Sequence, residues 1–302
     1  MARILVTGGS GFLGGNIVSF LANRGHDVTI LDCLAPITRG IAFLKHDLRS
    51  LGQLASDIDG HEIVIHLAAT SDTRANSADF RVDLDNSVSC TWNLLEATRQ
   101  TKTVKCCFFS SSQHVYGRQT GECQSEESLL HPISSYGAAK VACEAIFSAY
   151  SSSGGTSSVI GRISNIVGKG QNYGVLVDFI KRLKANPHEL RIWGNGSQQR
   201  NFLHVSDLCS AITFLIERPW SGGAQIFNLA NTSSLSVRRL AEIVVKEMQL
   251  PDCCITFESE NDAGWRGDPG SLRPNVNRIQ SFGWQPRFDC EAAVRQAVHE
   301  LI

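Results

Sequence analysis

The sequence predicts an α/β fold, in which a doubly wound parallel sheet is followed by a smaller C-terminal α/β lobe. Three observations support this prediction. Short apolar runs alternate with amphipathic segments along the first half of the chain, a glycine-rich turn follows the first run, and the alternation loosens beyond residue 163. Alternating strands and helices favour a parallel sheet covered on both faces. With 302 residues the chain is long enough for two domains.

The first predicted strand, residues 3–7, runs into a glycine turn that contains Gly8, Gly11 and Gly14. Gly8 permits the tight turn, Gly11 lets a pyrophosphate approach the N-terminus of the next helix, and Gly14 lets helix and strand pack closely. The second strand ends at Asp32, whose carboxylate can accept hydrogen bonds from a ribose diol and repels a 2'-phosphate. This Rossmann-type pattern predicts a dinucleotide site that prefers NAD to NADP.

Further strands and a helix are predicted next. A strand at residues 41–45 leads to Asp47, which either reaches the adenine edge of the dinucleotide or caps the following helix. The apolar run at 63–69 is typical of a buried parallel strand, and we interpret its His66 as a core or strand-end histidine. A stripe of apolar positions predicts a helix over about 83–100.

Three residues are candidates for catalysis. The strand at 104–109 ends in a serine cluster. Because the carboxyl ends of parallel strands face the ligand crevice, Ser112 can hydrogen-bond a substrate oxygen. The alternative is that the serines only end the strand. Tyr136 and Lys140 are four residues apart, so on a helix they share a face. The ammonium would then lower the pKa of the phenol and make it a base near neutral pH. The alternative is a pair of half-exposed surface residues.

The second half of the chain contains a Ser/Gly-rich loop at 151–158, a strand at 159–163, and two clear helices near the C-terminus. Ser236 is a candidate N-cap for the first of these helices, which carries an apolar stripe up to Met248. Apolar positions between residues 293 and 301 predict the last helix.

Composition excludes several classes of protein. The formal net charge is −1 without a basic cluster, so a phosphate-neutralising surface for nucleic acid is not supported. No apolar run approaches the ~20 residues of a membrane span, and we expect a soluble, cytoplasmic protein. The ten cysteines include no Cys-x-x-Cys pair, so we expect reduced thiols and assign no metal site.

Seven motifs occur in a fixed order along almost the whole chain. They are Thr7 to Gly14, Asp47-Leu48, His66 to Ala69, Asn86 with Asn93 to Ala97, Ser110 to Gly117, Tyr136 with Lys140, and Asn201 to Asp207. This ordered set resembles the extended short-chain dehydrogenase/reductase family, in particular its NAD-dependent epimerase/dehydratase branch. The resemblance implies a homodimer that binds a nucleotide-diphosphate sugar.

The resemblance also implies roles for individual residues. The catalytic trio would be Ser112, Tyr136 and Lys140, with Lys140 also on the nicotinamide ribose. The implied NAD-binding positions are Gly8, Gly11, Phe12, Leu13, Gly14, Asp32, Asp47, Leu48, Leu67, Ala68, Ala69, Asn86, Tyr136 and Lys140. The implied substrate-binding positions are Ser112, Gln113, His114, Asn165, Arg200 and Arg266. Guanidinium groups suit a diphosphate, although surface salt bridges are the alternative for both arginines.

The expected domain division follows from the same resemblance. Residues 1–163 plus about 207–230 would form the NAD-binding domain, and about 164–206 with 231–302 would hold the nucleotide sugar.

Two residues after Ser112 bear on the reaction. Dehydratases of this family typically carry an Asp-Glu pair before Val-Tyr-Gly, whereas this chain has Gln113-His114. The missing carboxylates favour a nucleotide-sugar 4-epimerase acting on a UDP-hexose-like substrate. A nucleotide-4-keto-sugar reductase is the first alternative and a 4,6-dehydratase the next, with His114 as an open candidate acid or base. A non-catalytic dinucleotide-binding protein is the least favoured. Asn201 replaces the usual Asp of its motif, which leaves the sugar open.

Overall fold

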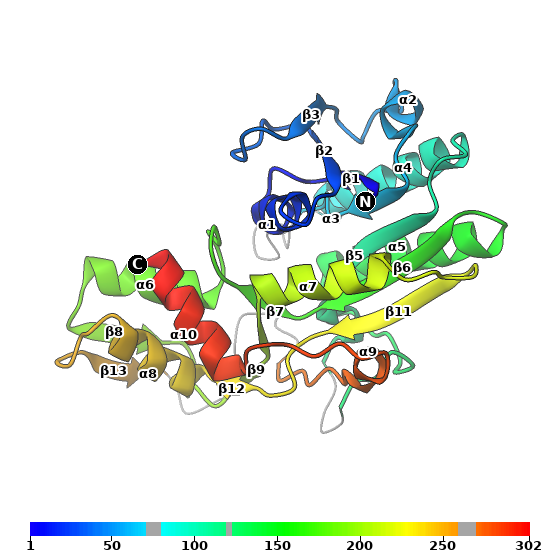
Figure 1. Ribbon diagram of the computed structural model, residues 1–302. Coiled ribbons are helices and arrows are strands. Elements are labelled where there is room, and N and C mark those ends of the chain that lie inside the picture. The colour runs from blue at the N-terminus through cyan, green and yellow to red at the C-terminus, as the bar shows by residue number, and fades with distance from the viewer. Residues whose placement is uncertain (71–79, 119–122, 259–269) are drawn as a thin grey trace. The chain divides into compact units, whose positions relative to one another are not determined.

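A computed structural model describes residues 1–70, 80–118, 123–258 and 270–302 (Figure 1). These residues form two compact units. The first comprises Met1–Gly117, Leu129–Arg162 and Cys209–Phe227, and the second comprises Arg118–Ser128, Ile163–Leu208 and Asn228–Ile302.

The first unit contains a seven-stranded sheet with its helices. Its elements are β1 (Arg3–Thr7), α1 (Phe12–Ala22), β2 (Asp27–Asp32), β3 (Ala42–Lys45), α2 (Leu54–Ile58), β4 (Ile63–His66), α3 (Phe80–Asp83), a π-helical turn (Leu84–Ser89), α4 (Cys90–Arg99), β5 (Cys106–Ser112), a 3-10 turn (Gln113–Tyr116), α5 (Ser135–Ser152), β6 (Ser157–Ile163), α7 (Val205–Ile216) and β11 (Ala224–Leu229). Helix α7 and the strands β6 and β11 each extend slightly across the division between the units.

The strand order is β11-β6-β5-β4-β1-β2-β3. The strand β1 lies between β2 and β4 and pairs in parallel with both, so that Ile4 is opposite Val28 on one side and Ile63 on the other. The pairs β2–β3 and β4–β5 are parallel as well. Because the order reverses at β1, the carboxyl ends of β1 and β4 flank the crevice where doubly wound sheets bind their ligands. The predicted fold class is confirmed.

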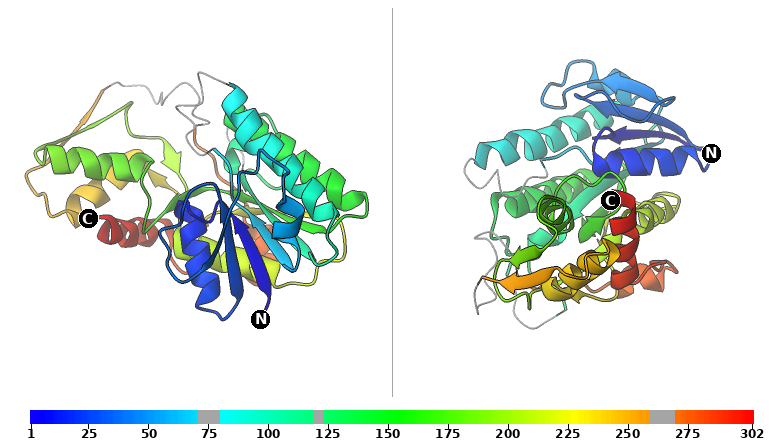
Figure 2. Two further views of the ribbon diagram at one scale, coloured as in Figure 1. Left: turned by 90° about the horizontal axis from the view of Figure 1, so that it is seen from above. Right: turned by 90° about the vertical axis from the view of Figure 1, so that its left-hand side faces the viewer.

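Helices cover both faces of this sheet (Figure 2). On one face, α2, α4 and α5 pack on alternate strand residues such as Leu5, Val64 and Phe109, which are all buried. On the other face lie α1 and α7 (Figures 1 and 2). Strands that are buried on both faces carry apolar side chains at successive positions. This explains why continuous apolar runs in the sequence predict these strands.

Three element boundaries differ from the prediction. The strand β4 ends at His66, so residues 67–69 follow the strand instead of completing it. The strand β5 continues through the serine cluster to Ser112, and all seven of its residues are buried. The predicted helix near residue 83 begins earlier, at Phe80, and contains the π-helical turn.

The second unit consists of short strands and four helices among its described residues. Its elements are β7 (Asn165–Val167), α6 (Val175–Ala185), β8 (Glu189–Ile192), β9 (Gln199–Arg200), β10 (Phe202–His204), β12 (Leu235–Ser236), α8 (Val237–Glu247), β13 (Cys254–Phe257), α9 (Asn277–Ser281) and α10 (Cys290–Leu301). The strands pair as β10–β7, β12–β9 and β13–β8.

Helices α6, α8 and α10 share one apolar core, which includes Ile180, Leu240, Val244 and Val294. The predicted N-cap is confirmed, because the Ser236 hydroxyl accepts a hydrogen bond of 3.0 Å from the backbone N–H of Arg239.

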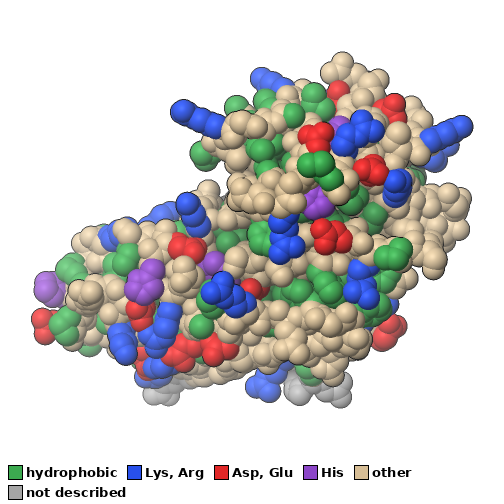
Figure 3. All heavy atoms as spheres, viewed as in Figure 1, with side chains coloured by type: hydrophobic (Ala, Val, Ile, Leu, Met, Phe, Trp, Pro, Cys, Tyr) green, Lys and Arg blue, Asp and Glu red, His purple; other side chains and the backbone are tan. Residues whose placement is uncertain are grey.

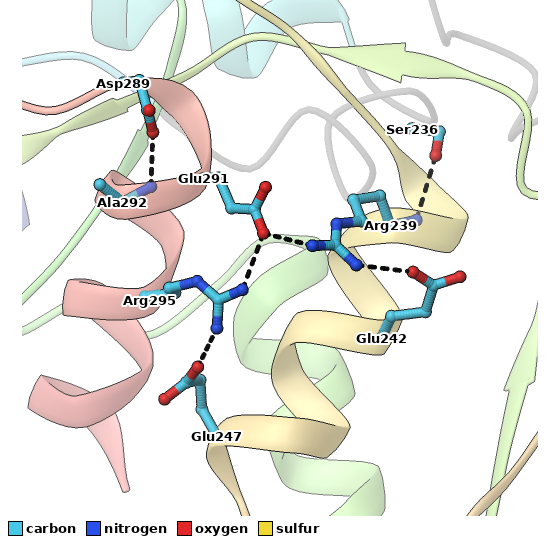
Figure 4. Close-up of polar contacts among 8 residues, drawn as sticks. All are labelled: Ser236, Arg239, Glu242, Glu247, Asp289, Glu291, Ala292 and Arg295. Carbon is cyan, nitrogen blue, oxygen red and sulfur yellow. Dashed lines mark hydrogen bonds and ion pairs between the residues drawn. The ribbon is translucent and has the colours of Figure 1, made fainter.

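Ion pairs join α8 to α10 at the surface (Figure 4). The Glu291 carboxylate accepts hydrogen bonds from Arg239 and from Arg295, the latter at 2.7 Å. Arg295 also pairs with Glu247, and Arg239 with Glu242 at 3.0 Å. A single exposed ion pair of this kind contributes little to the free energy of unfolding, but a shared network fixes α8 and α10 in register.

Acidic and basic side chains are interspersed on the face of the molecule shown in Figure 3. All ten cysteines are free, and Cys106 and Cys107 are buried in β5. Among residues 1–70, 80–118, 123–258 and 270–302, no helix is long and apolar enough to cross a bilayer, and no group of three His, Cys, Asp or Glu side chains is arranged to hold a metal.

Candidate active site

The glycine turn between β1 and α1 can exist only with glycine at two of its positions. Gly8 has a φ of +71°, and a Cβ placed there would lie 2.6 Å from the backbone nitrogen of Ala68. At Gly14, a Cβ would lie 2.1 Å from the carbonyl oxygen of Gly8. Real Cβ atoms do not approach backbone so closely, so the turn, α1 and the segment after β4 pack without room for side chains.

The N-terminus of α1 leaves its backbone donors available for a ligand. Gly11 is the N-cap residue, is exposed, and supplies no side-chain cap. Phe12 and Leu13, two of the predicted NAD contacts, are half-buried in the first helical turn. Uncapped N–H groups and the positive end of the helix dipole together suit a phosphate.

The Asp32 carboxylate at the end of β2 is fixed by backbone hydrogen bonds and can accept more. Its two carboxylate oxygens accept hydrogen bonds of 3.0 Å from the backbone N–H groups of Ser10 and Leu34. A carboxylate has about four acceptor sites, so lone pairs on both oxygens remain for a ribose diol. This geometry fits the role that the sequence predicts for Asp32.

Asp47 lies in a turn and does not cap a helix. It accepts a hydrogen bond from the backbone N–H of Arg49 at 3.0 Å and pairs with the Arg49 guanidinium at 2.5 Å. The hydrogen bonds from the Arg49 side chain lower the pKa of Asp47 to about 2. The helix α2 has Gln53 as its N-cap residue, so the cap alternative for Asp47 is wrong. The neighbouring Leu48 is buried, and its carbonyl accepts a hydrogen bond from Asn93.

The remaining predicted NAD contacts follow β4 or precede α4. Leu67, Ala68 and Ala69 are half-buried directly after the strand, and the N–H of Leu67 donates to the carbonyl of Thr7 at 3.1 Å. Asn86 is half-buried in the π-helical turn, a distortion that is frequent at functional sites.

His66 is a fully paired core histidine, as the sequence suggests. Its Nδ1 lies 2.7 Å from the hydroxyl of Thr7, and its Nε2 lies 3.1 Å from the hydroxyl of Thr91. Since Thr91 donates its own proton to the sulfur of Cys143, its oxygen accepts from His66, which assigns the imidazole proton to Nε2. Burial lowers the pKa of His66 to about 3, so it stays neutral and does not act as the catalytic acid or base.

Lys140 is buried next to Tyr136 on α5. Its side chain is 3% exposed, and its ammonium donates a hydrogen bond of 2.7 Å to the carbonyl of Ser110. The ammonium also lies 5.7 Å from the centroid of the Tyr136 ring and 4.8 Å from that of Phe109. Burial lowers the pKa of Lys140 to about 8. A cation fixed this close to the phenol favours its ionised form.

The end of β5 brings further candidates to Tyr136. Ser112 is buried, and its hydroxyl accepts a hydrogen bond of 3.3 Å from the backbone N–H of His114. The His114 ring meets that of Tyr136 edge to face, with centroids 5.6 Å apart. Gln113 is buried, and its side-chain oxygen has no hydrogen-bond partner among the described residues. An unpaired buried acceptor beside Ser112 suits a hydroxyl donor from a ligand.

A buried ion pair that no sequence motif marks lies behind this site. Glu144 on α5 and Arg162 on β6 pair at 2.8 Å, and Ser111 and Tyr116 hydrogen-bond to the two partners. Glu144 follows Lys140 by four residues, so helical spacing alone could have placed it on the same face.

The predicted substrate residues of the second unit lie on two of its short strands. Asn165 begins β7 and donates a hydrogen bond of 3.0 Å to the carbonyl of Asn201. Arg200 at the end of β9 directly precedes Asn201 and donates to the carbonyl of Gly270 at 2.7 Å. Asn165 and Arg200 are therefore brought together. Arg266 lies outside the described residues.

Asn201 itself has a structural role that explains its departure from the motif. Its amide nitrogen donates two hydrogen bonds of 2.7 Å, to the carbonyls of Asn231 and Ser233, and its oxygen accepts one of 2.8 Å from the N–H of Asn231. A carboxylate cannot donate these two bonds. The two backbone carbonyls near residue 201 therefore require an amide donor, which explains why Asn stands where the motif usually has Asp.

Comparison with known proteins identifies a family and relatives of this chain. Residues 4–230 match the NAD dependent epimerase/dehydratase family. A putative UDP-glucose 4-epimerase of Methanocaldococcus jannaschii is 30% identical over 98% of this chain and 97% of its own length. A dTDP-glucose 4,6-dehydratase of Streptomyces niveus is 27% identical over 81% of this chain and 77% of its own length.

A solved structure agrees over nearly the whole chain. The UDP-glucose 4-epimerase of Thermus thermophilus, in complex with NAD, has a TM-score of 0.86 at 26% identity and covers 99% of this chain and 98% of its own. The glycine turn, the uncapped helix and Asp32 are a set of residues that fits a dinucleotide. Because the family match runs from β1 to the end of β11, the chain belongs to the NAD-dependent epimerase/dehydratase family and uses NAD as its cofactor.

Proposed function

We propose that this enzyme is a nucleotide-sugar 4-epimerase that acts on a UDP-hexose-like substrate. The observation that carries the proposal is the end of β5, where Gln113 and His114 replace the carboxylate pair of a dehydratase while Ser112, Tyr136 and Lys140 are all present. Elimination of a hydroxyl needs an acid and a base in addition to Tyr136. Without the two carboxylates, return of the hydride to the sugar is the simpler outcome.

Each residue has a defined task in this proposal. Tyr136 removes the proton of the C4 hydroxyl, and Lys140 stabilises the phenolate. Ser112 donates a hydrogen bond to the oxygen on which charge develops. NAD, when bound, supplies the hydride acceptor for C4 and later the hydride donor. Tyr136 returns the proton after the 4-keto sugar has turned, which inverts C4 and restores the enzyme.

The second unit would hold the nucleotide. Arg200 and Arg266 are proposed to bind the diphosphate, and Asn165 to lie close to it, because guanidinium groups match phosphate oxygens in geometry and charge. The first unit would accordingly be the NAD-binding domain and the second the nucleotide-sugar lobe.

The direct test uses a panel of UDP-, dTDP-, CDP- and GDP-sugars with no added cofactor. An epimerase retains NAD through purification and yields isomeric products. A 4-ketoreductase, the alternative, would instead consume a reduced cofactor stoichiometrically with a 4-keto sugar. That consumption, with no isomer from any sugar of the panel, would refute the epimerase proposal.

Tyr136→Phe tests the assigned base. We expect turnover to be abolished while NAD binding is largely retained, since the ring remains and only the phenolic oxygen is lost. The measurements are product formation and NAD content by mass analysis. Activity that survives the substitution would show that another group is the base.

We further propose that two copies associate through the helical segment from α3 to α4. Large apolar side chains are exposed there at intervals of four or eight residues, with Phe80 70% and Trp92 60% exposed. Side chains of this kind are enriched in the cores of interfaces. A homodimer would cover them.

A further inference from the structure

The strongest unexplained feature of the first unit is the buried ion pair behind the catalytic helix. Glu144 is 4% exposed and Arg162 is 2% exposed. The Arg162 guanidinium donates to the two carboxylate oxygens of Glu144 at 3.0 and 2.8 Å, a bidentate geometry. Taking two charges out of water is costly, and an apolar pair of similar volume is often as stable. Stability alone therefore does not account for this pair.

The contacts of the pair lead to the predicted catalytic residues. Glu144 lies four residues beyond Lys140 and eight beyond Tyr136, so the three side chains follow one face of α5. Ser111, the residue before Ser112, donates its hydroxyl proton to Glu144.

The contacts of Arg162 complete the connection. Arg162 donates to the phenol oxygen of Tyr116 at 3.1 Å, and Tyr116 ends the 3-10 turn that starts at Gln113. One buried network thus connects α5, the end of β5, the turn after it and β6.

We propose that Glu144 and Arg162 are a positioning pair, which holds α5 in a fixed register on the end of β5 and so fixes Tyr136 and Lys140 relative to Ser112. This inference rests on the proposed function only for the roles of those three residues. The pair itself does not touch the reacting atoms. Its charges also balance each other one helical turn from the Lys140 ammonium.

Among the described residues, four other titratable groups act on Lys140 or lie beside it. Cys143 and Tyr136 lie on its own helix, Asp83 faces it from α3, and His66 from β4. Burial raises the pKa of the Cys143 thiol, and His66 is neutral above a pH of about 3. Within the part of the chain that the structure describes, Asp83 and Glu144 are therefore the carboxylates that act on the ammonium.

The first experiment follows the Nζ resonance of Lys140 by NMR through pH, with Lys140→Met to assign it. Glu144→Gln leaves Arg162 unbalanced, so the pKa of Lys140 should fall. Arg162→Met leaves Glu144 unbalanced, so that pKa should rise. A unit charge about one to two helical turns away, at an effective dielectric constant of about 20, corresponds to roughly one to two pKa units. The double variant should bring the pKa back towards its original value.

A pair that does not act on the ammonium would leave the Lys140 pKa unchanged in all three variants, even if each variant lost thermal stability. That result would overturn the inference. Because the titration needs no substrate, its outcome is independent of the proposed function. The expected titration pattern without any isomerised nucleotide sugar would refute the epimerase proposal and leave the positioning pair intact.

Two milder variants test the same inference if an unbalanced charge prevents the protein from folding. Ser111→Ala removes one buried hydrogen bond from α5 near the site, while Ser151→Ala removes the 2.7 Å bond to Ser158 at the far end of the same helix. For Ser111→Ala we expect kcat to fall about tenfold with KM within about twofold, since small displacements of reacting groups are costly. For Ser151→Ala we expect kcat to change by less than about twofold. Equal kcat values for the two variants would contradict the inference.

Discussion

The substitution Gly14→Ala should distort the glycine turn and lower the stability of the protein. The same substitution at the next residue, Gly15→Ala, should not destabilise it. At Gly14 a Cβ would lie 2.1 Å from the Gly8 oxygen and 2.6 Å from the Cα of Gly9. At Gly15 the nearest atoms are the Thr38 hydroxyl oxygen at 3.8 Å and the Gly9 oxygen at 4.0 Å, which are ordinary contacts.

The expected magnitudes follow from two opposing effects. Alanine in place of glycine in a helix gains up to ~1 kcal/mol at either position. At Gly14 the backbone must move by about 1 Å to reach normal contact, and overpacking of a rigid site costs about 3 kcal/mol. Gly15→Ala should therefore stabilise the protein by up to ~1 kcal/mol, and Gly14→Ala should destabilise it by about 2 kcal/mol.

Urea unfolding of the two variants and of the unaltered protein, each stripped of cofactor, measures this difference of about 3 kcal/mol between adjacent residues. Isothermal titration with NAD should in addition show at least a roughly tenfold loss of affinity for Gly14→Ala, about 1.4 kcal/mol. Equal unfolding free energies for the two variants would show that the turn can relax around a methyl group, and the steric argument would then be wrong.

Three further predictions concern other parts of the molecule. Turnover should decline as pH rises through about 8, because Lys140 then loses its ammonium; Lys140→Arg should remove this decline in a pH profile, and an unchanged decline would assign it to another group. Asn201→Asp should cost about 2–4 kcal/mol in thermal unfolding, because a carboxylate would face the carbonyls of Asn231 and Ser233, and a loss under ~1 kcal/mol would contradict this. Trp92→Glu should convert the proposed dimer to a monomer in sedimentation velocity, and an unchanged dimer would exclude this surface.

Local pattern was sufficient for most elements of the fold. The glycine turn, the apolar runs and the N-cap Ser236 are short-range features, and each predicted an element close to its observed position. The serine cluster at the end of β5 was harder to predict. Ser110 and Ser111 are polar in composition but buried in the sheet, where their hydroxyls bond to the carbonyl of His66 and to Glu144. Such partners are distant in sequence.

Contacts between residues distant in sequence also determine much of the candidate site. Tyr136 and Lys140 lie four residues apart on one helix, so the spacing alone predicts that they share a face. The pairing of Glu144 with Arg162 spans 18 residues and two elements, so no periodicity reveals it. The satisfied amide of Asn201 depends on carbonyls 30 and 32 residues away. Contacts of this type require the fold to be known.

The division of the chain into two units has a practical consequence. Each unit is assembled from three separate segments that alternate along the sequence, so the backbone passes from one unit to the other five times. No single cut can release either unit whole, and neither can be produced as one uninterrupted fragment. A nick at any one passage leaves four covalent connections between the two units, so proteolysis there should yield a nicked but associated molecule.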